Sequence, residues 1–289
     1  MVATTPDDLG LGTWRREPGT VVRRAVTVPA GDLTPLAIVA GSEVPGVATE
    51  WPPHSHPMHE LVWVRGGTLT SRIGKEIFTV PAGFGLWLPA GVVHGGRLTA
   101  AAELHDAFFA PDRTPVEFAG PTSITMTPLL ESLLVRLAGP GLDAGARART
   151  EAVVFDVLAP SERQFALELP GDPRIDPIAE ALLRNPSDDR GLQEWADQLG
   201  LSERTITRAF RGATGLSFAQ WRQALRVHEA LALLSEGADV RGVSERLGYA
   251  QPSTFIAAFR RVMKVTPGLL ALDVRNSVSP VLSAGLPTT

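Results

Sequence analysis

The stretch LQEWADQLGLSERTITRAFRGATGLS, residues 192–217, decides the fold of the second half of the chain because a second copy follows it. The later copy is VRGVSERLGYAQPSTFIAAFRRVMKVTP, residues 240–267. Gly200 aligns with Gly248, and Ala209-Phe210-Arg211 aligns with Ala258-Phe259-Arg260, so the second copy has one extra residue in its turn. A repeat of this length with matching apolar positions predicts two copies of one structural unit.

Each copy has the sequence features of a helix-turn-helix. In the first copy, Trp195 and Ala196 belong to an apolar stripe at helical spacing. Gly200 follows the stripe, where a helix end often requires positive φ. Ser202 is suited to cap the next helix, on which Ile206 is expected to point inward.

The second helix of each copy carries a basic or polar face opposite its apolar face. Arg204, Arg208 and Arg211 lie at i, i+4 and i+7, and a guanidinium can bridge phosphates or the O6/N7 edge of guanine. A single basic face of this kind is as often an ordinary solvated surface as a DNA-binding surface. The presence of two copies of the pattern is what favours DNA binding. The candidate DNA-binding residues are Arg204, Thr205, Thr207, Arg208, Arg211, Gln251, Ser253, Thr254, Ala257, Arg260 and Arg261.

The segment between the copies, FAQWRQALRVHEALALLS (218–235), has an unbroken helical pattern. A helix of this length spans roughly 27 Å. That length suits two recognition helices about one DNA turn, ~34 Å, apart on one face of the duplex.

Residues 173–270 resemble the DNA-binding domain of the AraC/XylS family of bacterial transcription regulators. The resemblance rests on LGLSERTITRAFRGATGLSFAQWRQALRVHEALALL, then LGYAQPSTFIAAFRR and TP. Three residues depart from the family pattern: Lys264 replaces the usual glycine, Leu270 a common aromatic, and Ser244 the usual alanine of the second copy. The resemblance implies binding to promoter or operator DNA, recruitment of RNA polymerase and a homodimer.

Composition agrees with two functions in one chain. The formal net charge is −4, yet residues 1–170 are acidic while the window 200–264 is basic. The absence of cysteine excludes disulfides, thiolate metal sites and a cysteine nucleophile. The N-terminus has no apolar core typical of a signal peptide, and the most apolar run is interrupted by Gly and Pro, so we expect a cytoplasmic protein without a membrane span.

The first half reads as β-structure. From about residue 21 to 110, short runs rich in Val, Ile, Thr, Trp and Phe are divided by Gly and Pro, which predicts an antiparallel sandwich or barrel. Helical patterns follow at 124–138 and 145–158. Their apolar residues either cover the open side of the β-domain or form a dimer contact, and Leu130, Leu134, Val135 and Val154 are the candidates.

The histidine-rich stretch HSHPMHE, residues 54–60, lies in this first half. His54 and His56, then Glu60, resemble the first motif of the cupin fold, and Gly83, Pro89, Gly91 and His94 resemble the second motif. The resemblance implies a small β-barrel that the AraC/XylS family often uses as a sensor. In metal-binding cupins the positions matching His54, His56, Glu60 and His94 hold one ion.

Two interpretations of this site remain open. Three imidazoles and a carboxylate suit Zn, Fe, Mn, Co or Ni, and alternation along a strand would turn His54 and His56 to the same side. A pocket with similar residues can also hold a small organic effector without metal. The candidate effector-binding residues are His54, His56, Glu60, Trp63, Trp87, His94 and Arg97.

The predicted fold is an α+β multidomain chain, with a cupin-like barrel followed by an all-α domain of two helix-turn-helix motifs joined by a linker helix. The predicted parts are an N-terminal arm (1–20), the sensor barrel (21–120), a helical dimerisation segment (121–160), a linker (161–172), the DNA-binding domain (173–275) and a disordered tail (276–289).

The leading prediction is a sequence-specific DNA-binding transcriptional regulator, not an enzyme, whose sensor binds a small molecule or a metal. The alternative is a cupin metalloenzyme of dioxygenase or isomerase type with an appended DNA-binding domain. The β-strands offer few acid–base groups beside the histidines, which favours binding over turnover. A structural chromosome-binding protein is a third possibility, and it would bind DNA without sequence preference.

Overall fold

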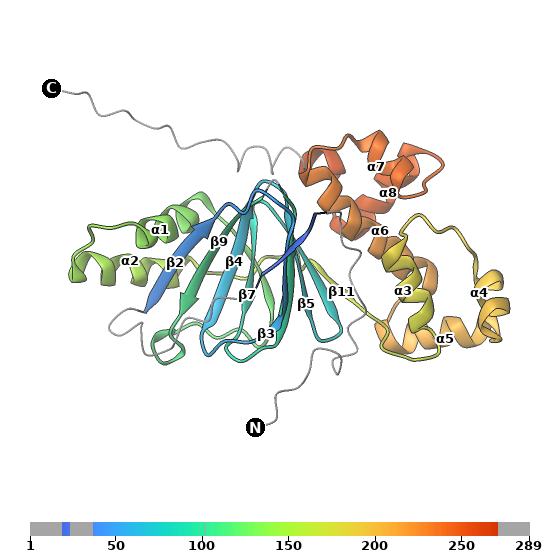
Figure 1. Ribbon diagram of the computed structural model, residues 1–289, viewed down its shortest axis with the longest axis horizontal. Helices are drawn as coiled ribbons and strands as arrows, with labels where there is room; N and C mark the ends of the chain where they lie inside the picture. Colours follow the sequence, from blue (N-terminus) through green and yellow to red (C-terminus); the bar gives the residue numbers. More distant parts are fainter. Residues whose placement is uncertain (1–18, 24–36, 101, 271–289) are drawn as a thin grey trace.

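The computed structural model describes residues 19–23, 37–100 and 102–270. Almost all of the predicted arm (1–20) and the whole predicted tail (276–289) lie outside these residues. The described chain forms a β-domain with a helix pair at one end and a helical domain at the other (Figure 1). No helix among the described residues is long and apolar enough to span a membrane.

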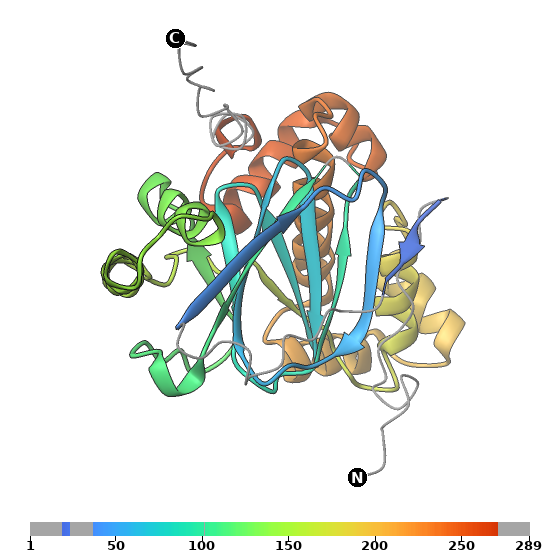
Figure 2. The same ribbon diagram turned by 60° about the vertical axis from the view of Figure 1, so that its left-hand side comes forward.

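The β-domain consists of two sheets whose strands surround a common interior (Figure 2). One sheet has the order β1-β3-β8-β5-β6-β11, and the other has the order β10-β7-β4-β9-β2. The two sheets share no strand pairing, so the predicted barrel is an open two-sheet structure. The strands are β1 (Val21–Val22), β2 (Ile38–Glu43), β3 (Thr49–His54), β4 (His59–Arg65), β5 (Thr68–Ile73), β6 (Glu76–Pro81), β7 (Phe84–Leu88), β8 (His94–Leu98), β9 (Glu103–Phe109), β10 (Thr122–Thr125) and β11 (Ala166–Glu168).

Two helices cover the outer face of the five-stranded sheet: α1 (Pro128–Ala138) and α2 (Ala144–Val157). Three of the four residues considered for dimer contacts, Leu130, Leu134 and Val154, are fully buried inside the chain against this sheet. They are therefore unavailable to a partner. Val135, in contrast, is 43% exposed.

The predicted boundaries need two corrections. Residues 161–172 are more than a linker, because β11 pairs with β6 and continues the six-stranded sheet. Phe165, Leu167 and Leu169 alternate along this segment and are all buried, which explains why it adheres to the sheet. The segment 121–160 likewise begins with β10, which pairs with β7.

The C-terminal domain has the predicted duplicated architecture. Its helices are α3 (Asp176–Arg184), α4 (Leu192–Leu199), α5 (Glu203–Thr214), α6 (Phe218–Ser235), α7 (Val240–Arg246) and α8 (Pro252–Met263). The α4–α5 and α7–α8 pairs are the two helix-turn-helix units. Gly200 and Gly248 take φ of 65° and 73° at the turns, and α6 has the predicted bounds.

The helical domain is docked directly on the β-domain through α6. Trp221 donates its indole N–H to the Glu168 carbonyl at 2.7 Å, and the Thr79 hydroxyl lies 3.0 Å from His228 Nδ1. Ile77, Leu167 and Leu169 of the sheet share one apolar cluster with α3, α4, α5 and α6. The linker helix α6 therefore packs against both the β-domain and the other helices of the C-terminal domain.

Candidate DNA and effector sites

The recognition face of α5 is exposed as predicted. Ile206, Ala209 and Phe210 are buried, whereas Arg204 and Arg208 point to solvent. Ser202 caps the helix through the Thr205 N–H, and its hydroxyl also lies 2.8 Å from the Thr205 hydroxyl. With Arg211, which is also exposed, α5 presents three arginines to solvent, and the Ser202 cap fixes where the helix begins.

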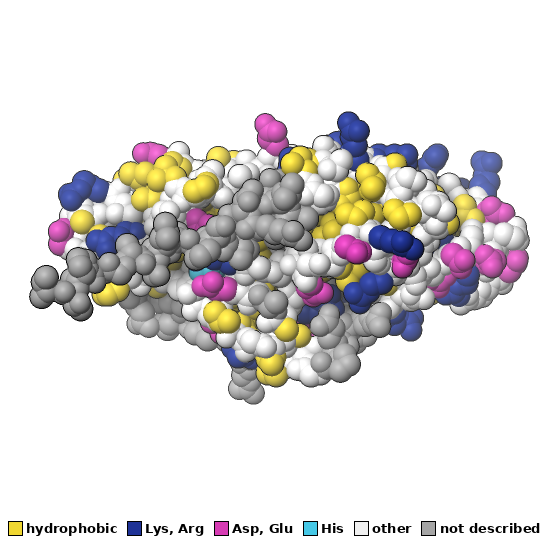
Figure 3. Space-filling model, turned by 90° about the horizontal axis from the view of Figure 1, so that it is seen from above, with side chains coloured by type: hydrophobic (Ala, Val, Ile, Leu, Met, Phe, Trp, Pro, Cys, Tyr) yellow, Lys and Arg dark blue, Asp and Glu magenta, His cyan; other side chains and the backbone are white. Residues whose placement is uncertain are grey.

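The matching face of α8 is also exposed. Phe255, Ala258 and Phe259 are buried, while Ala257 and Arg260 point to solvent. The face borders a shallow surface hollow lined by Ser253, Ile256, Ala257, Arg260, Arg261 and Thr266. Figure 3 shows Lys and Arg side chains on the part of the molecule formed by the helical domain. All eleven predicted DNA-binding residues are exposed or half-buried, so none is lost to the core.

A cavity of about 380 Å³ lies between the two sheets of the β-domain. Its size falls within the range of small-molecule sites. Both sheets supply the walls, and His56 enters from the turn after β3. The residues that line it are Val39, Ala40, Gly41, Ser42, Glu43, Trp51, His54, His56, Glu60, Val62, Leu69, Ser71, Leu88, His94, Gly96, Leu104, Asp106 and Phe108.

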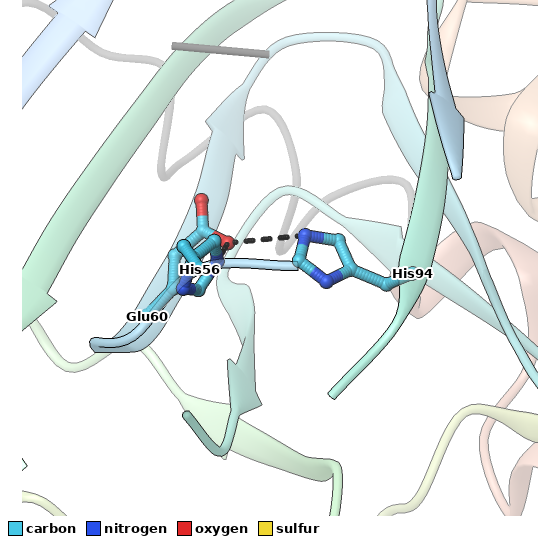
Figure 4. Close-up of side chains that lie close together, drawn as sticks. All are labelled: His56, Glu60 and His94. Carbon is cyan, nitrogen blue, oxygen red and sulfur yellow. Dashed lines mark hydrogen bonds and ion pairs between the residues drawn. The ribbon is translucent and has the colours of Figure 1, made fainter. Parts of the chain in front are cut away.

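Within the cavity, His56, Glu60 and His94 converge (Figure 4). Glu60 Oε2 lies 3.0 Å from His56 Nε2 and 3.5 Å from His94 Nε2. Burial alone would raise the pKa of Glu60, but the hydrogen bonds and charges of both histidines outweigh it and lower the pKa to about 2. Glu60 is therefore a carboxylate at any ordinary pH.

The backbone fixes which nitrogen of each ring faces the carboxylate. Nδ1 of His56 donates to the Met58 carbonyl at 2.7 Å, and Nδ1 of His94 donates to the Val92 carbonyl at 3.0 Å, since a carbonyl can only accept. Nε2 of each ring therefore faces Glu60, and without the proton of that contact it offers a lone pair to an ion. This is how proteins commonly orient metal-ligating histidines, so the donor set fits a divalent ion.

His54, the predicted fourth ligand, lines the cavity but stands outside this group of converging donors. Its ring lies 4.3 Å from the His94 ring between centroids, and its Nδ1 donates to the Pro52 carbonyl. The β3–β8 pairing shifts register between Trp51 and His54, and β3 ends at His54. Simple strand alternation therefore does not relate His54 to His56.

Three predicted effector-binding residues do not line the cavity. Trp63 stacks on His105 and Trp87 stacks on His59, and both indoles belong to the core beneath α1 and α2. Arg97 follows Gly96, which does line the cavity, so its side chain points to the other face of β8. Arg97 is therefore not placed to contact an effector in this cavity, contrary to the prediction.

Four polar residues of the cavity were not among the candidate effector-binding residues: Ser42, Glu43, Ser71 and Asp106. Asp106 on β9 is partly buried there, and burial, followed by the charges of Glu60 and Glu43, raises its pKa to about 6. Alternation along ELHDAFF, residues 103–109, carried the signal, because Leu104, Asp106 and Phe108 share one face.

Comparison with known proteins agrees with both halves of the geometry. Residues 195–271 match the family model described as a helix-turn-helix domain, and residues 39–149 match the one described as an AraC-like ligand binding domain. The HTH-type transcriptional regulator NimR of Escherichia coli is 33% identical over 222 residues, which cover 75% of this chain and 81% of NimR. The chain belongs to the AraC family of transcriptional regulators.

Two further relatives extend the comparison. The HTH-type transcriptional regulator RipA of Corynebacterium glutamicum is 29% identical over 225 residues, or 72% of this chain and 60% of RipA. The solved DNA-binding domain of AdpA, in complex with a target DNA, is 29% identical and covers 37% of this chain and 96% of that chain, with a TM-score of 0.34. The two matched family models and the helices of the C-terminal domain show that this chain combines a ligand-binding domain with a DNA-binding domain that contains two helix-turn-helix units.

Proposed function

We propose that α5 and α8 bind two successive major-groove segments of an operator, and that occupancy of the cavity between the sheets controls this binding. The observation that carries the proposal is the duplicated pair of exposed faces, held by one continuous helix that is itself docked on the ligand-binding domain. A ligand that changes the β-domain acts on α6 directly, and through α6 on both recognition helices.

The test begins with an operator selected from random DNA by the full-length protein. Arg208→Ala and Arg260→Ala should each weaken binding by about tenfold, because each removes a guanidinium contact worth roughly 1–3 kcal/mol. Arg149→Ala, an equal loss of charge at an exposed position of α2, serves as the control. Binding by the parent should fall steeply with salt. Unchanged affinity of both recognition-helix variants at moderate salt would refute the assignment of these faces.

The cavity is also proposed to accept a divalent cation, with His56, Glu60 and His94 as ligands. A bound Zn, Fe, Mn, Co or Ni ion would supply a Lewis-acidic charge at this end of the cavity. Metal content of untagged protein tests the idea. The parent should hold near one equivalent, His56→Ala should lose it, and His54→Ala should keep most of it. Loss in both variants would restore His54 as a ligand.

The same cluster favours one second candidate, a metalloenzyme of cupin type. The relatives are transcriptional regulators, which supports binding over turnover as the function here. Metal-loaded protein that converts a cavity ligand to product, with loss of the activity in His56→Ala, would establish the enzyme instead.

A homodimer and contact with RNA polymerase complete the proposal. The exposed apolar side chains of the helix pair, Leu129, Val135 and Val153, are the candidates for the dimer contact. Figure 3 shows hydrophobic side chains on this end of the molecule. Val135→Asp should yield monomers in sedimentation, whereas Val21→Asp, at similar exposure on β1, should not. An unaffected dimer would exclude this surface.

A further inference from the structure

The cavity has an uneven distribution of charge. Three carboxylates, of Glu43, Glu60 and Asp106, are part of its lining, and no lysine or arginine is among the lining residues that the structure describes. Glu43 is half-exposed and pairs with Arg23 at 2.8 Å, and Glu60 is bonded to its histidines. Asp106 differs from both, since no ion pair with it occurs among the described residues.

The backbone is built to admit this carboxylate. Asp106 lies on β9 directly opposite Gly41 of β2, and a Cβ on Gly41 would lie 3.2 Å from Asp106 Oδ1. The Gly41 N–H donates a hydrogen bond to the carboxylate of Asp106, but this backbone donor carries no charge. The raised pKa agrees with a negative charge that is poorly solvated and faces other negative charges. Among the described residues, Asp106 therefore has no counter-charge inside the cavity.

Apolar side chains make up part of the cavity wall on both sheets. Trp51 lines the cavity from one sheet, and Val62, Leu104 and Phe108 line it from the other. Phe108 also stands edge-on to the His56 ring, with 5.4 Å between centroids. Apolar wall residues beside a carboxylate that has no ion pair among the described residues favour a compact ligand with one charged end.

We propose that this cavity binds a small organic cation, whose protonated amine or amidine lies against Asp106 and whose aromatic or aliphatic body lies along the apolar walls. The inference rests on the proposed role of the cavity as the effector site. A cation beside Asp106 neutralises a charge that has no ion pair among the described residues, whereas an anionic ligand adds like charge where no described lining residue is a lysine or an arginine.

Benzamidine, benzamide and benzoate test the inference, because they share one ring and differ in the charge of the end group. Calorimetric titrations use full-length protein after chelator treatment, so that no metal can hold the carboxylate. Benzamidine should bind the parent about tenfold or more tightly than benzoate, because the cation meets a carboxylate in a poorly solvated site. In Asp106→Asn this difference should shrink to about twofold or less, as a neutral amide no longer pairs with the cation.

Glu103→Gln is the matched control, since Glu103 lies on the same strand and faces away from the cavity. It should keep the benzamidine preference of the parent. The comparison of probes on the parent protein stands even if Asp106→Asn folds poorly. Equal or tighter binding of benzoate, no binding of benzamidine, or a preference that persists in folded Asp106→Asn would each overturn the inference. Because no DNA is present, these outcomes are independent of a failure of operator binding.

Discussion

Ser244 is a residue at which this chain departs from its family, and the structure shows the consequence. It occupies the α7 position that matches Ala196 of α4, it is completely buried, and its hydroxyl has no hydrogen-bond partner. A buried hydroxyl without a partner costs about 1–3 kcal/mol. The first helix-turn-helix has Ala196 at the matching position, which buries no hydroxyl group.

Ser244→Ala should therefore raise the free energy of unfolding by about 1 kcal/mol, since the methyl group fits the same space without a stranded donor. Urea denaturation followed by circular dichroism measures the change. Ala196→Ser is the reciprocal variant and should lower stability by a similar amount. A less stable Ser244→Ala protein would mean that the hydroxyl has a partner, such as a bound water.

Lys264 is the second such departure. It is the C-cap of α8 and has φ of 60°, the left-handed conformation that favours glycine. No other non-glycine residue in the described chain has positive φ. The glycine usual in the family relieves a strain that this chain retains.

Lys264→Gly should stabilise the protein by about 1 kcal/mol, because glycine adopts this conformation without the steric cost that an L-residue bears. Lys264→Ala removes the same charge but keeps the strain, so its stability should stay near that of the parent. Chemical denaturation of the two variants compares them directly. Equal stabilisation by alanine would assign the effect to charge rather than to φ.

At the scale of elements, α2 is anchored to the edge strand β2 by one side chain. Glu151 accepts hydrogen bonds from the backbone N–H groups of Ala37 and Ile38, both at 3.2 Å. Arg147 pairs with Glu151 at 3.3 Å and donates to the Ile38 carbonyl. Since β2 supplies one wall of the cavity, this anchor connects the helix pair to the ligand site.

Glu151→Ala should lower the free energy of unfolding by about 3 kcal/mol, because it leaves two backbone donors without their acceptor and Arg147 without its ion pair. Thermal and urea unfolding are the measurements. Asp156→Ala removes an exposed acid from the same helix and should change stability by less than about 0.5 kcal/mol. Similar losses in the two variants would show that helix charge, not the anchor, is responsible.

At the scale of the whole molecule, His228 lies at the interface of the two domains. Its ring is fully buried between α6 and the sheet, and burial lowers its pKa to about 4. The unfolded chain takes up a proton as pH falls through the ordinary value of 6.5, whereas the folded chain does so only near pH 4. The neutral ring thus stabilises the fold above pH 6.5, and this contribution is lost as pH falls from 6.5 to 4.

The loss should amount to about 3 kcal/mol over that interval. In His228→Gln, whose amide can still bond to Thr79, the free energy of unfolding should fall less over the same interval. Unfolding at a series of pH values gives both curves, and their difference isolates His228 from the other histidines. Parallel curves would contradict the prediction, because they would show that the pKa of His228 is the same in the folded and the unfolded chain.

The duplication at 192–217 and 240–267 by itself determined the helical domain. Local signals sufficed there, because capping residues, turn glycines and helical apolar spacing act between residues close in the chain. The bounds of α6 and the exposed arginine faces followed from the same signals. HSHPMHE likewise indicated a polar pocket, and His54, His56, Glu60 and His94 do line one cavity.

Only the tertiary structure decided which residues complete the sites. Period-two alternation from Glu60 already excludes Trp63, but the register shift in β3 that separates His54 from the donor group is a property of strand pairing. The docking of α6, the adhesion of β11 and the pairing of Asp106 with Gly41 join residues distant in the chain. Such contacts depend on packing between surfaces that are each unremarkable in sequence, and so the sequence alone could not reveal them.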